Sequence, residues 1–417
     1  MSEIPKISPA TIYLLLILMV VTGSINTIAN KMQNNLESLG KPYQHVWFIT
    51  FCMFLGESTC LLWYAIHLIK KSKNAPLLEN SSQSGKETET ETKKEVSVWI
   101  LAIPALADFF GSTIMTFGLT MLTGSVYQMF RGSLILFTAL FSIVFLGRKL
   151  FRHHFLGIAI TVTGLLVVGL ATFIYPAATP EGCGSGRGAS NSISGIVLII
   201  IAQIFSASQF VIEEKIMTTY KCHPLQVVGW EGVWGSLIYA ILLVIFQFIP
   251  CTAPPVDGTN LSYFICSPND KGEWLLEDTS FAFRQMGNNG YLLFWVIFYT
   301  CSIAVFNFVG ISITKYLSSP ARAVIDTVRT VVVWFFFLMP FINKCYRETF
   351  NYLQLIGFVF LVLGTIVYNE VIVLPFLGFN KNLKNTKDAE ITDEENAASM
   401  KTAAVEKFLS DEENKNE

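Results

Sequence analysis

Apolar runs long enough to cross a membrane recur along the whole chain. Each run holds about 20 residues, which as a helix rising 1.5 Å per residue spans the ~30 Å hydrocarbon core of a bilayer. The connection "LTG" at 122–124 is so short that the two runs beside it are expected to form a tight hairpin. The pattern predicts ten transmembrane helices, at 9–30, 46–69, 97–121, 123–146, 154–174, 192–213, 226–249, 288–312, 320–343 and 351–374.

The composition favours an all-α, polytopic membrane protein. Of the 417 residues, 52% are hydrophobic and 14% are charged, and the mean hydropathy is +0.50. A soluble domain carries about 25% charged residues, so this chain has too little polar surface for a soluble globule. The start "MSEIPKISPA" lacks a basic segment and a small-residue cleavage site, so the first apolar run is expected to stay as a helix.

The connections divide the expected helices into two sets of five. Residues 70–95 are rich in Ser, Glu and Lys and are expected to be a disordered cytosolic loop. Residues 250–287 are expected to form a long lumenal loop. The predicted organisation is a cytosolic N-terminus (1–8), a first repeat (9–174), a lumenal linker (175–191), a second repeat (192–374) and a flexible cytosolic tail (375–417).

The distribution of Lys and Arg predicts the orientation. With the N-terminus in the cytosol, the cytosolic connections carry thirteen Lys and Arg, Arg322 among them, and the lumenal connections carry seven, including Lys31. Because positive charge is enriched on the cytosolic side, both termini are expected in the cytosol. The basic turn "GRKLFRHH" is the strongest single indication, and its His153–His154 pair is interpreted as surface.

Cysteines and a glycosylation motif agree with this orientation. Cys251 and Cys266 share the loop 250–287, where disulfides persist if it faces the lumen, so we expect them to pair; two free thiols are the alternative. The motif "NLS" at Asn260 lies in the same loop and is a candidate glycan acceptor, whereas "NSS" at Asn80 is expected to stay unmodified in the cytosol.

The two halves repeat the same polar pattern. Gln128 precedes Arg131 by three residues, as Asp326 precedes Arg329. "FLGIAITVTGL" (155–165) and "LIGFVFLVLGT" (355–365) each carry two glycines seven apart. Since an odd number of helices per half inverts the second half, the pattern predicts an inverted-topology repeat, the recurring construction of secondary transporters. General likeness among apolar helices is the alternative.

Weaker correspondences extend the repeat to the earlier helices of each half. Glu57 in "LGES" matches Glu231 in "GWEGVWG", and Asp108 has Asn307 as a rough counterpart. Gly157 and Gly164 are expected to line a helix–helix seam, within one chain or between two copies in a homodimer.

Two arginines lie deep in predicted spans. Arg131 is eight residues inside its span, about 12 Å at 1.5 Å per residue, and Arg329 is as deep from the other side. A charge at the bilayer centre costs about 2.5–3.5 kcal/mol on insertion scales, so both are expected to face a polar interior. An intrahelical ion pair between Asp326 and Arg329 that only fixes packing is the alternative for the second arginine. Arg131 would need another partner, such as Glu57 or Asp108.

Three carboxylates in apolar runs are candidate proton or cation carriers. They are Glu57, Asp108 and Glu231, and a structural hydrogen bond is the alternative for each. "EEK" at 213–215 is interpreted either as part of the site or as a solvated helix end. The sequence shows no phosphate-binding loop, no zinc-ligand spacing and no nucleophile–base set, so we predict neither an enzyme nor a cofactor or metal site. The net charge of −2 argues against a nucleic-acid partner.

Several segments together resemble a known family of transporters. "YQMFRGSLILFTALFSIVFLGRKL", "HPLQVVGWEGVWG", "FNFVGISITKYLSSPARAVIDTVRTVVVW" and "LIGFVFLVLGTIVYNE" are similar to solute carrier family 35, subfamily F, of the drug/metabolite transporter superfamily. The likeness covers about residues 10–375. It implies ten helices in two inverted halves, alternating access, and an intracellular membrane, lysosomal or vacuolar, with a mitochondrial location as alternative. Cys251 and Cys266 are also similar to disulfide-bonded lumenal loops in chloroquine-resistance-type transporters.

These observations predict a secondary transporter for a small polar metabolite, with proton coupling as a further hypothesis. The expected site comprises Glu57, Asp108, Gln128, Arg131, Glu231, Asn307, Asp326 and Arg329. Four carboxylates against two guanidiniums favour a cationic, zwitterionic or amino-acid-like cargo over a nucleotide sugar. The alternatives are a nucleotide-sugar antiporter and a membrane adaptor that recruits partners through the 70–95 loop and the tail.

Overall fold

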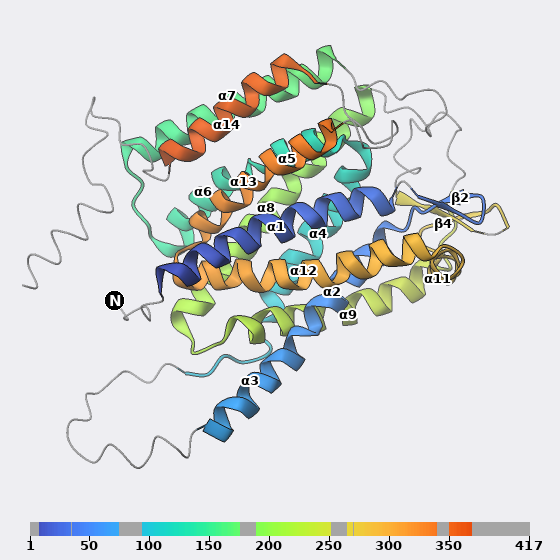
Figure 1. Cartoon of the computed structure of the whole chain (residues 1–417), viewed down its shortest axis with the longest axis horizontal. Helices are drawn as coiled ribbons and strands as arrows, with labels where there is room; N and C mark the ends of the chain where they lie inside the picture. The colour runs from blue at the N-terminus through green and yellow to red at the C-terminus, as the bar shows by residue number, and fades with distance from the viewer. Residues whose placement is uncertain are drawn as a thin grey trace, which may run out of the picture.

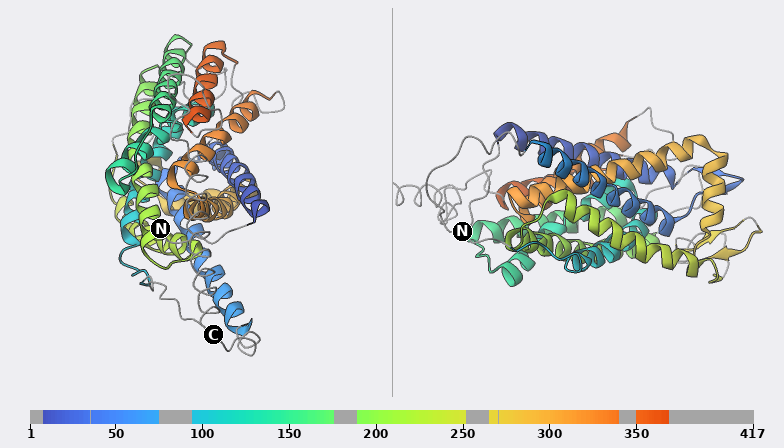
Figure 2. Two further views of the ribbon diagram at one scale, coloured as in Figure 1. Left: turned by 90° about the vertical axis from the view of Figure 1, so that its left-hand side faces the viewer. Right: turned by 90° about the horizontal axis from the view of Figure 1, so that it is seen from below.

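The chain folds into a bundle of long helices with two short β-hairpins at one end (Figures 1 and 2). The computed structural model describes residues 8–34, 36–74, 94–175, 189–251, 265–269, 271–339 and 350–368. The helices are α1 (Pro9–Gln33), α2 (Val46–Ser58), α3 (Cys60–Asn74), α4 (Ala102–Met121), α5 (Gly124–Arg131), α6 (Leu134–Leu146), α7 (Arg152–Ile174), α8 (Ala189–Thr219), α9 (Pro224–Phe246), α11 (Thr279–Asn288), α12 (Gly290–Tyr316), α13 (Ser319–Leu338) and α14 (Tyr352–Tyr368).

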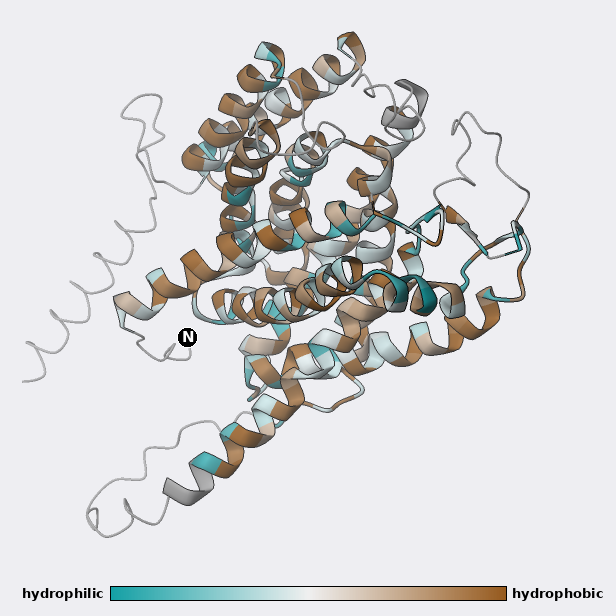
Figure 3. Cartoon of the chain, turned by 45° about the vertical axis from the view of Figure 1, so that its right-hand side comes forward, coloured by the Kyte–Doolittle hydropathy of each residue, from teal (hydrophilic) through white to brown (hydrophobic). Residues whose placement is uncertain are grey.

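Eight helical segments in the described residues are long and apolar enough to cross a membrane. They correspond to the first eight predicted spans. The ninth, α13, has 20 residues but contains Arg322, Asp326 and Arg329, and the tenth, α14, is apolar with 17 described residues. Many large apolar residues of the helices are exposed, as expected for contact with lipid, and Figure 3 shows that most helices are apolar along much of their length.

Two predicted spans are each broken into two helices. Span 46–69 is α2 and α3, with Thr59 between them, and α3 leads away from the bundle (Figure 1). The Ser58 and Thr59 hydroxyls donate to the carbonyls of Leu55 and Gly56 at the break, a local hydrogen bond that competes with the helix. Span 123–146 is α5 and α6, separated by Gly132 and Ser133.

Glycines allow α7 and α14 to pack in backbone contact. A Cβ atom at Gly164 would lie 2.7 Å from the carbonyl oxygen of Gly357, and one at Gly364 would lie 2.7 Å from that of Gly157. Figure 1 shows the two helices lying together along one edge of the bundle. The glycine seam expected from the sequence therefore lies within one chain.

The other extensive helix pairings are α4 with α8, α1 with α12, and α2 with α9. Each of these pairs joins one helix from residues 9–174 to one from 192–374. Buried apolar side chains of α1, α2, α9 and α12 form the largest core cluster, and a second cluster lies among α4, α5, α7, α8 and α14. The two predicted halves are thus packed against each other throughout.

The two β-hairpins and helix α11 form a cap at one end of the bundle, which we call the hairpin end. β1 (Glu37–Ser38) pairs with β2 (Lys41–Pro42), and β3 (Ser267–Pro268) pairs with β4 (Trp274–Leu275), both antiparallel. Helix α11 lies beside them (Figure 1). Cys251 and Cys266 form a disulfide, the pairing expected from the sequence.

A buried histidine ties the cap to α2. His45 Nδ1 contacts a Glu277 carboxylate oxygen and His45 Nε2 lies 2.9 Å from Gln285 Oε1. Glu277 also accepts from the backbone N–H of Phe48, and Gln285 Nε2 donates to the carbonyl of Ser38 at 3.0 Å. The expected loop 250–287 therefore contains folded structure within residues 265–269 and 271–287. The glycosylation motifs at Asn80 and Asn260 and the tail 375–417 lie outside the described residues.

Candidate functional site

A cavity lies among the helices and is lined by charged and amide side chains from both halves of the chain. It measures about 90 Å³ as space for water-sized groups, enough for several waters, since one water needs roughly 10–15 Å³ on this measure. Its polar lining includes Asn26 and Asn30 of α1, Asp108 of α4, Arg131 of α5, Gln209 of α8, Asn307 of α12, and Arg322 and Arg329 of α13.

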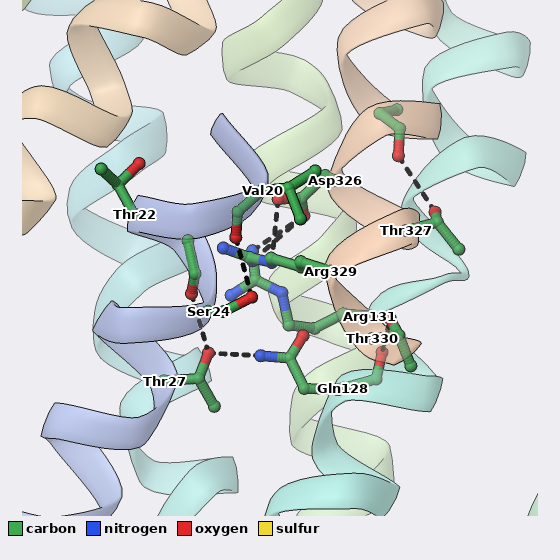
Figure 4. Close-up of polar contacts among 12 residues, drawn as sticks. Val20, Thr22, Ser24, Thr27, Gln128, Arg131, Asp326, Thr327, Arg329 and Thr330 are labelled. Carbon is green, nitrogen blue, oxygen red and sulfur yellow. Dashed lines mark hydrogen bonds and ion pairs between the residues drawn. The ribbon is translucent and has the colours of Figure 1, made fainter. Parts of the chain in front are cut away.

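The two arginines predicted from the sequence meet at one carboxylate. Arg131 Nη2 and Arg329 Nη2 each donate to Asp326 Oδ2 at 3.1 Å, and Arg329 Nε lies 3.1 Å from Asp326 Oδ1. Figure 4 shows both guanidiniums converging on Asp326. The exposed fractions of the Arg131, Asp326 and Arg329 side chains are 15%, 3% and 2%. One carboxylate therefore neutralises two buried guanidiniums only in part.

The partner of Arg131 differs from the prediction. Neither Glu57 nor Asp108 neutralises it; Asp326 from the other half does. The intrahelical pair between Asp326 and Arg329 is present, but it forms part of a three-residue cluster instead of standing alone. The sequence reading failed here because it treated each helix separately, and spacing along one helix says nothing about which partner lies across the cavity.

The break between α5 and α6 stabilises Arg131 at this depth. Arg131 is the last residue of α5, where the helix dipole favours a cation. Its Nη1 donates to the Tyr127 hydroxyl at 3.0 Å and lies 2.9 Å from the sulfur of Met115. On the other side, the guanidinium of Arg329 lies 4.9 Å from the Phe306 ring centroid, and a Cβ atom at Gly23 would be 2.6 Å from Arg329 Nη1. Only glycine lets α1 pass so close to Arg329.

Gln128 lies next to this cluster but serves packing between helices. Its amide nitrogen donates to the Thr27 hydroxyl of α1, and its backbone carbonyl accepts from Thr330 of α13 at 3.4 Å (Figure 4). The side chain is fully buried. Gln128 is not among the residues that line the cavity, and its hydrogen bonds join α5 to α1 and α13.

The predicted carboxylates Glu57, Asp108 and Glu231 lie within electrostatic range of one another and are buried. Asp108 lines the cavity and accepts from the Ser112 hydroxyl at 2.6 Å. Glu57 accepts from the amide of Asn307, which also lines the cavity. Glu231 is 2% exposed and lies within electrostatic range of both carboxylates. The structure thus gathers all three, with Asp108 alone reaching the cavity surface.

Three charged residues at the end of the bundle opposite the hairpins are buried, which corrects the assignment of Arg322 and excludes a solvated helix end for Glu213 and Glu214. Arg322, counted as a connection charge, is 1% exposed and pairs with Glu213. Glu213 and Glu214 of the "EEK" segment are also buried, whereas Lys215 is exposed. Glu213 ends its predicted span and Arg322 is the third residue of its own span, and at such positions the sequence does not distinguish a solvated charge from a packed one.

Two smaller corrections concern basic residues. Lys31, counted as a lumenal charge, is 5% exposed and donates to the carbonyls of Leu119 and Leu122 at 2.8 and 2.7 Å. It caps the C-terminal end of α4. His153, interpreted as surface, is 4% exposed. Among the described residues, no group of His, Cys, Asp or Glu is arranged to hold a metal ion.

Comparison with known proteins decides the family. The family model for nucleotide-sugar transporters matches residues 10–244. The chain belongs to the nucleotide-sugar transporter family. It is therefore a multi-pass membrane protein of a transporter family rather than of an enzyme family, and its charged cavity lies within a fold used for transport.

Relatives extend the likeness over most of the chain. It is 38% identical over 358 residues to Solute carrier family 35 member F6 of Rattus norvegicus, which covers 84% of this chain and 87% of the relative. An uncharacterised protein of Schizosaccharomyces pombe is 31% identical over 365 residues, covering 87% of this chain and 98% of that protein. The UDP-N-acetylglucosamine/UDP-N-acetylgalactosamine transporter nstp-4 of Caenorhabditis elegans is 30% identical over 124 residues, 29% of this chain and 35% of nstp-4.

Proposed function

We propose that this protein is a secondary active transporter that moves a small polar metabolite across an intracellular membrane by alternating access. The observation that carries the proposal is the cluster of Arg131, Asp326 and Arg329, which joins both halves of the chain at a buried cavity. Two guanidiniums and one carboxylate leave an excess positive charge, whose cost inside a membrane falls when an anionic group binds.

The wider architecture supports this proposal. If each predicted span of the first half is exchanged with its counterpart in the second half, the pair α1 with α12 becomes the pair α8 with α4. The same exchange leaves the pairs α2 with α9 and α7 with α14 unchanged. Such a pattern fits ten helices in two inverted repeats, with the site between the halves. We place the protein in a lysosomal or vacuolar membrane with both termini cytosolic, as the family resemblance and the Lys and Arg distribution suggest.

The cavity favours a small cargo with both an anionic and a cationic group. Asp108 lines the same cavity as Arg131 and Arg329, so the site offers opposite charges to a zwitterion such as an amino acid. A nucleotide sugar carries two phosphate charges against one excess positive charge, and pockets for ligands of drug size measure roughly 300–1,000 Å³. The likeness to the UDP-sugar transporter covers 29% of this chain. We therefore rank a nucleotide-sugar antiporter second.

Buried carboxylates suggest proton coupling. Glu57, Asp108 and Glu231 lie close together inside the membrane-spanning part, and such residues are typical of proton relays in pumps and transporters. Asn307 connects Glu57 to the cavity surface. We assign proton transfer to this group and cargo binding to the arginine cluster.

Counterflow into proteoliposomes tests the function. Proteoliposomes that contain the purified protein are loaded with unlabelled pools of amino acids, monovalent organic acids or UDP-sugars. Uptake of the same pool, labelled and added outside, is then measured. We expect exchange of amino acids, and a loss of about 10- to 100-fold in Arg131→Gln, since a hydrogen bond to a charged group contributes about 1.5–3 kcal/mol. Lys149→Gln, which changes an exposed lysine, is the control. Exchange of no pool, or wild-type exchange by Arg131→Gln, would contradict the proposal.

A further inference from the structure

A second set of buried ion pairs joins α8 to the start of α13. Arg322 Nη1 donates to a Glu213 carboxylate oxygen, and the exposed fractions of these side chains are 1% and 0%. One residue along α8, Glu214 accepts from the backbone N–H of Ser319 at 2.8 Å and from its hydroxyl. The carboxylate thus binds the N-terminus of α13, where free N–H groups and the helix dipole favour an anion.

The same carboxylate reaches a third element. Arg148, which follows α6, donates from Nη2 to Glu214 Oε1. Its side chain is 37% exposed, whereas that of Glu214 is 4% exposed. We call Arg148, Glu213, Glu214, Ser319 and Arg322 the clamp. It holds together three segments, from α6, α8 and α13, at the end of the bundle opposite the hairpins.

The clamp closes one end of the cavity. Arg322 lines the cavity as well as pairing with Glu213, and its guanidinium lies 3.7 Å from the centroid of Phe210, another lining residue. Beyond this pair, the lining continues only toward the hairpin end, to Asn30 and Leu119 near the ends of α1 and α4. The other four clamp residues do not line the cavity.

We propose that the clamp is the gate on this side of the transport cavity and is closed in this structure. Separation of α13 from α8 would break both carboxylate contacts at once and open the cavity past Arg322 and Phe210. The proposal rests on the transport function and adds to it the side that is closed, the helices that part and the residue, Arg322, that belongs to both cavity and gate.

Cysteine labelling in sealed vesicles tests the gate without a known cargo. Ser206 lines the cavity two helical turns from Glu213 on α8, and Ser206→Cys provides the reporter. A membrane-impermeant maleimide is added outside the vesicles or trapped inside them. With an intact clamp we expect the introduced cysteine to be labelled from one face only, after subtraction of the labelling that the wild type shows at native cysteines such as the exposed Cys301. Glu213→Gln, which keeps the side-chain shape, is expected to raise labelling from the other face about tenfold, because a lost charged hydrogen bond shifts an equilibrium by that order.

Controls separate gate opening from misfolding and from failed transport. Lys215→Gln removes an exposed charge from the same helix end and is expected to leave the labelling unchanged. Cys52, buried in the core, reacts only if the variant unfolds. One-face labelling that persists in Glu213→Gln and in Arg322→Gln would overturn the proposal. Because labelling needs no cargo, its result can be interpreted even if the counterflow experiment detects no transport.

Discussion

Asp326 is the common partner of Arg131 and Arg329, two arginines that the sequence analysis treated separately. Its pairing with Arg329 within one helix was the alternative that the sequence left open, and that pair is present, but its second partner comes from α5, 195 residues away in the chain. Removing it would leave two buried cations without an anion, which costs more than either ion pair contributes. The cluster is therefore a single unit, and substitutions within it are expected to be non-additive.

His223 offers a residue-scale test of pH dependence. Burial, His67 and Lys315 lower its pKa from 6.5 to about 4, so the folded state binds fewer protons than the unfolded state between these values. Stability that depends on neutral His223 is therefore full above about pH 6.5 and is lost as the pH falls toward 4. His223→Asn keeps an acceptor for the N–H of Leu225 and is expected to show a smaller fall in Tm from pH 6.5 to 4. An equal fall in both proteins would contradict this assignment.

At the residue scale, depth within an apolar run was the informative signal. It identified Arg131, Arg329 and Asp108, all of which line the cavity or touch a residue that does. It failed for Glu213 and Arg322, because a charge near a helix end has the same sequence appearance whether it is solvated or packed. Only the tertiary contact between α8 and α13 distinguishes the two.

At the scale of elements, the glycine seam between α7 and α14 gives a matched pair of variants. A Cβ at Gly164 would overlap the backbone of Gly357, whereas one at Gly169 has its nearest neighbour at 3.4 Å. Gly164→Ala is expected to destabilise by about 1–3 kcal/mol through overpacking. Gly169→Ala is expected to be neutral or slightly stabilising, because alanine is the better helix former. Thermal unfolding in detergent measures both, and equal Tm values for the two variants would exclude backbone contact at the seam.

The sequence predicted where helices lie better than where they break. Hydropathy predicted α2 and α3 as one span, and α5 and α6 as another. An average over a window of residues does not detect one or two non-helical residues within it. The breaks depend on local hydrogen bonds of Ser58 and Thr59 and on Gly132. Glu57 and Arg131, two residues of the proposed site, lie directly beside these breaks.

At the scale of the whole molecule, the disulfide links the cap to the bundle and its contribution can be measured. Cys251 follows α9 and Cys266 precedes β3, with 15 residues of sequence separation. A loop of this length implies about 3 kcal/mol of stabilisation from closure. Reductant is expected to lower the Tm of the wild type but not that of a Cys251→Ser, Cys266→Ser double variant. An equal loss in both would show that the effect arises elsewhere.

The length of the apolar runs predicted the membrane-spanning segments, but it did not predict which helices pack against each other. Apolar runs predicted eight segments that the structure identifies as long enough to span a membrane. The contacts of α1 with α12 and α4 with α8 join residues far apart in the chain, and no local pattern specifies them. The paired glycines were an exception, since Gly157 and Gly164 predicted a close seam before its partner was known.

The incomplete neutralisation of Arg131 and Arg329 has an electrical consequence. If the cavity changes sides as proposed, any net charge inside it moves through the membrane potential, which contributes about 2.3 kcal/mol per elementary charge per 100 mV. Two guanidiniums and one carboxylate, all ionised, would make the return of the empty carrier sensitive to voltage. A cargo with a net charge of −1 would cancel that sensitivity, whereas a zwitterion would leave the charge that moves unchanged.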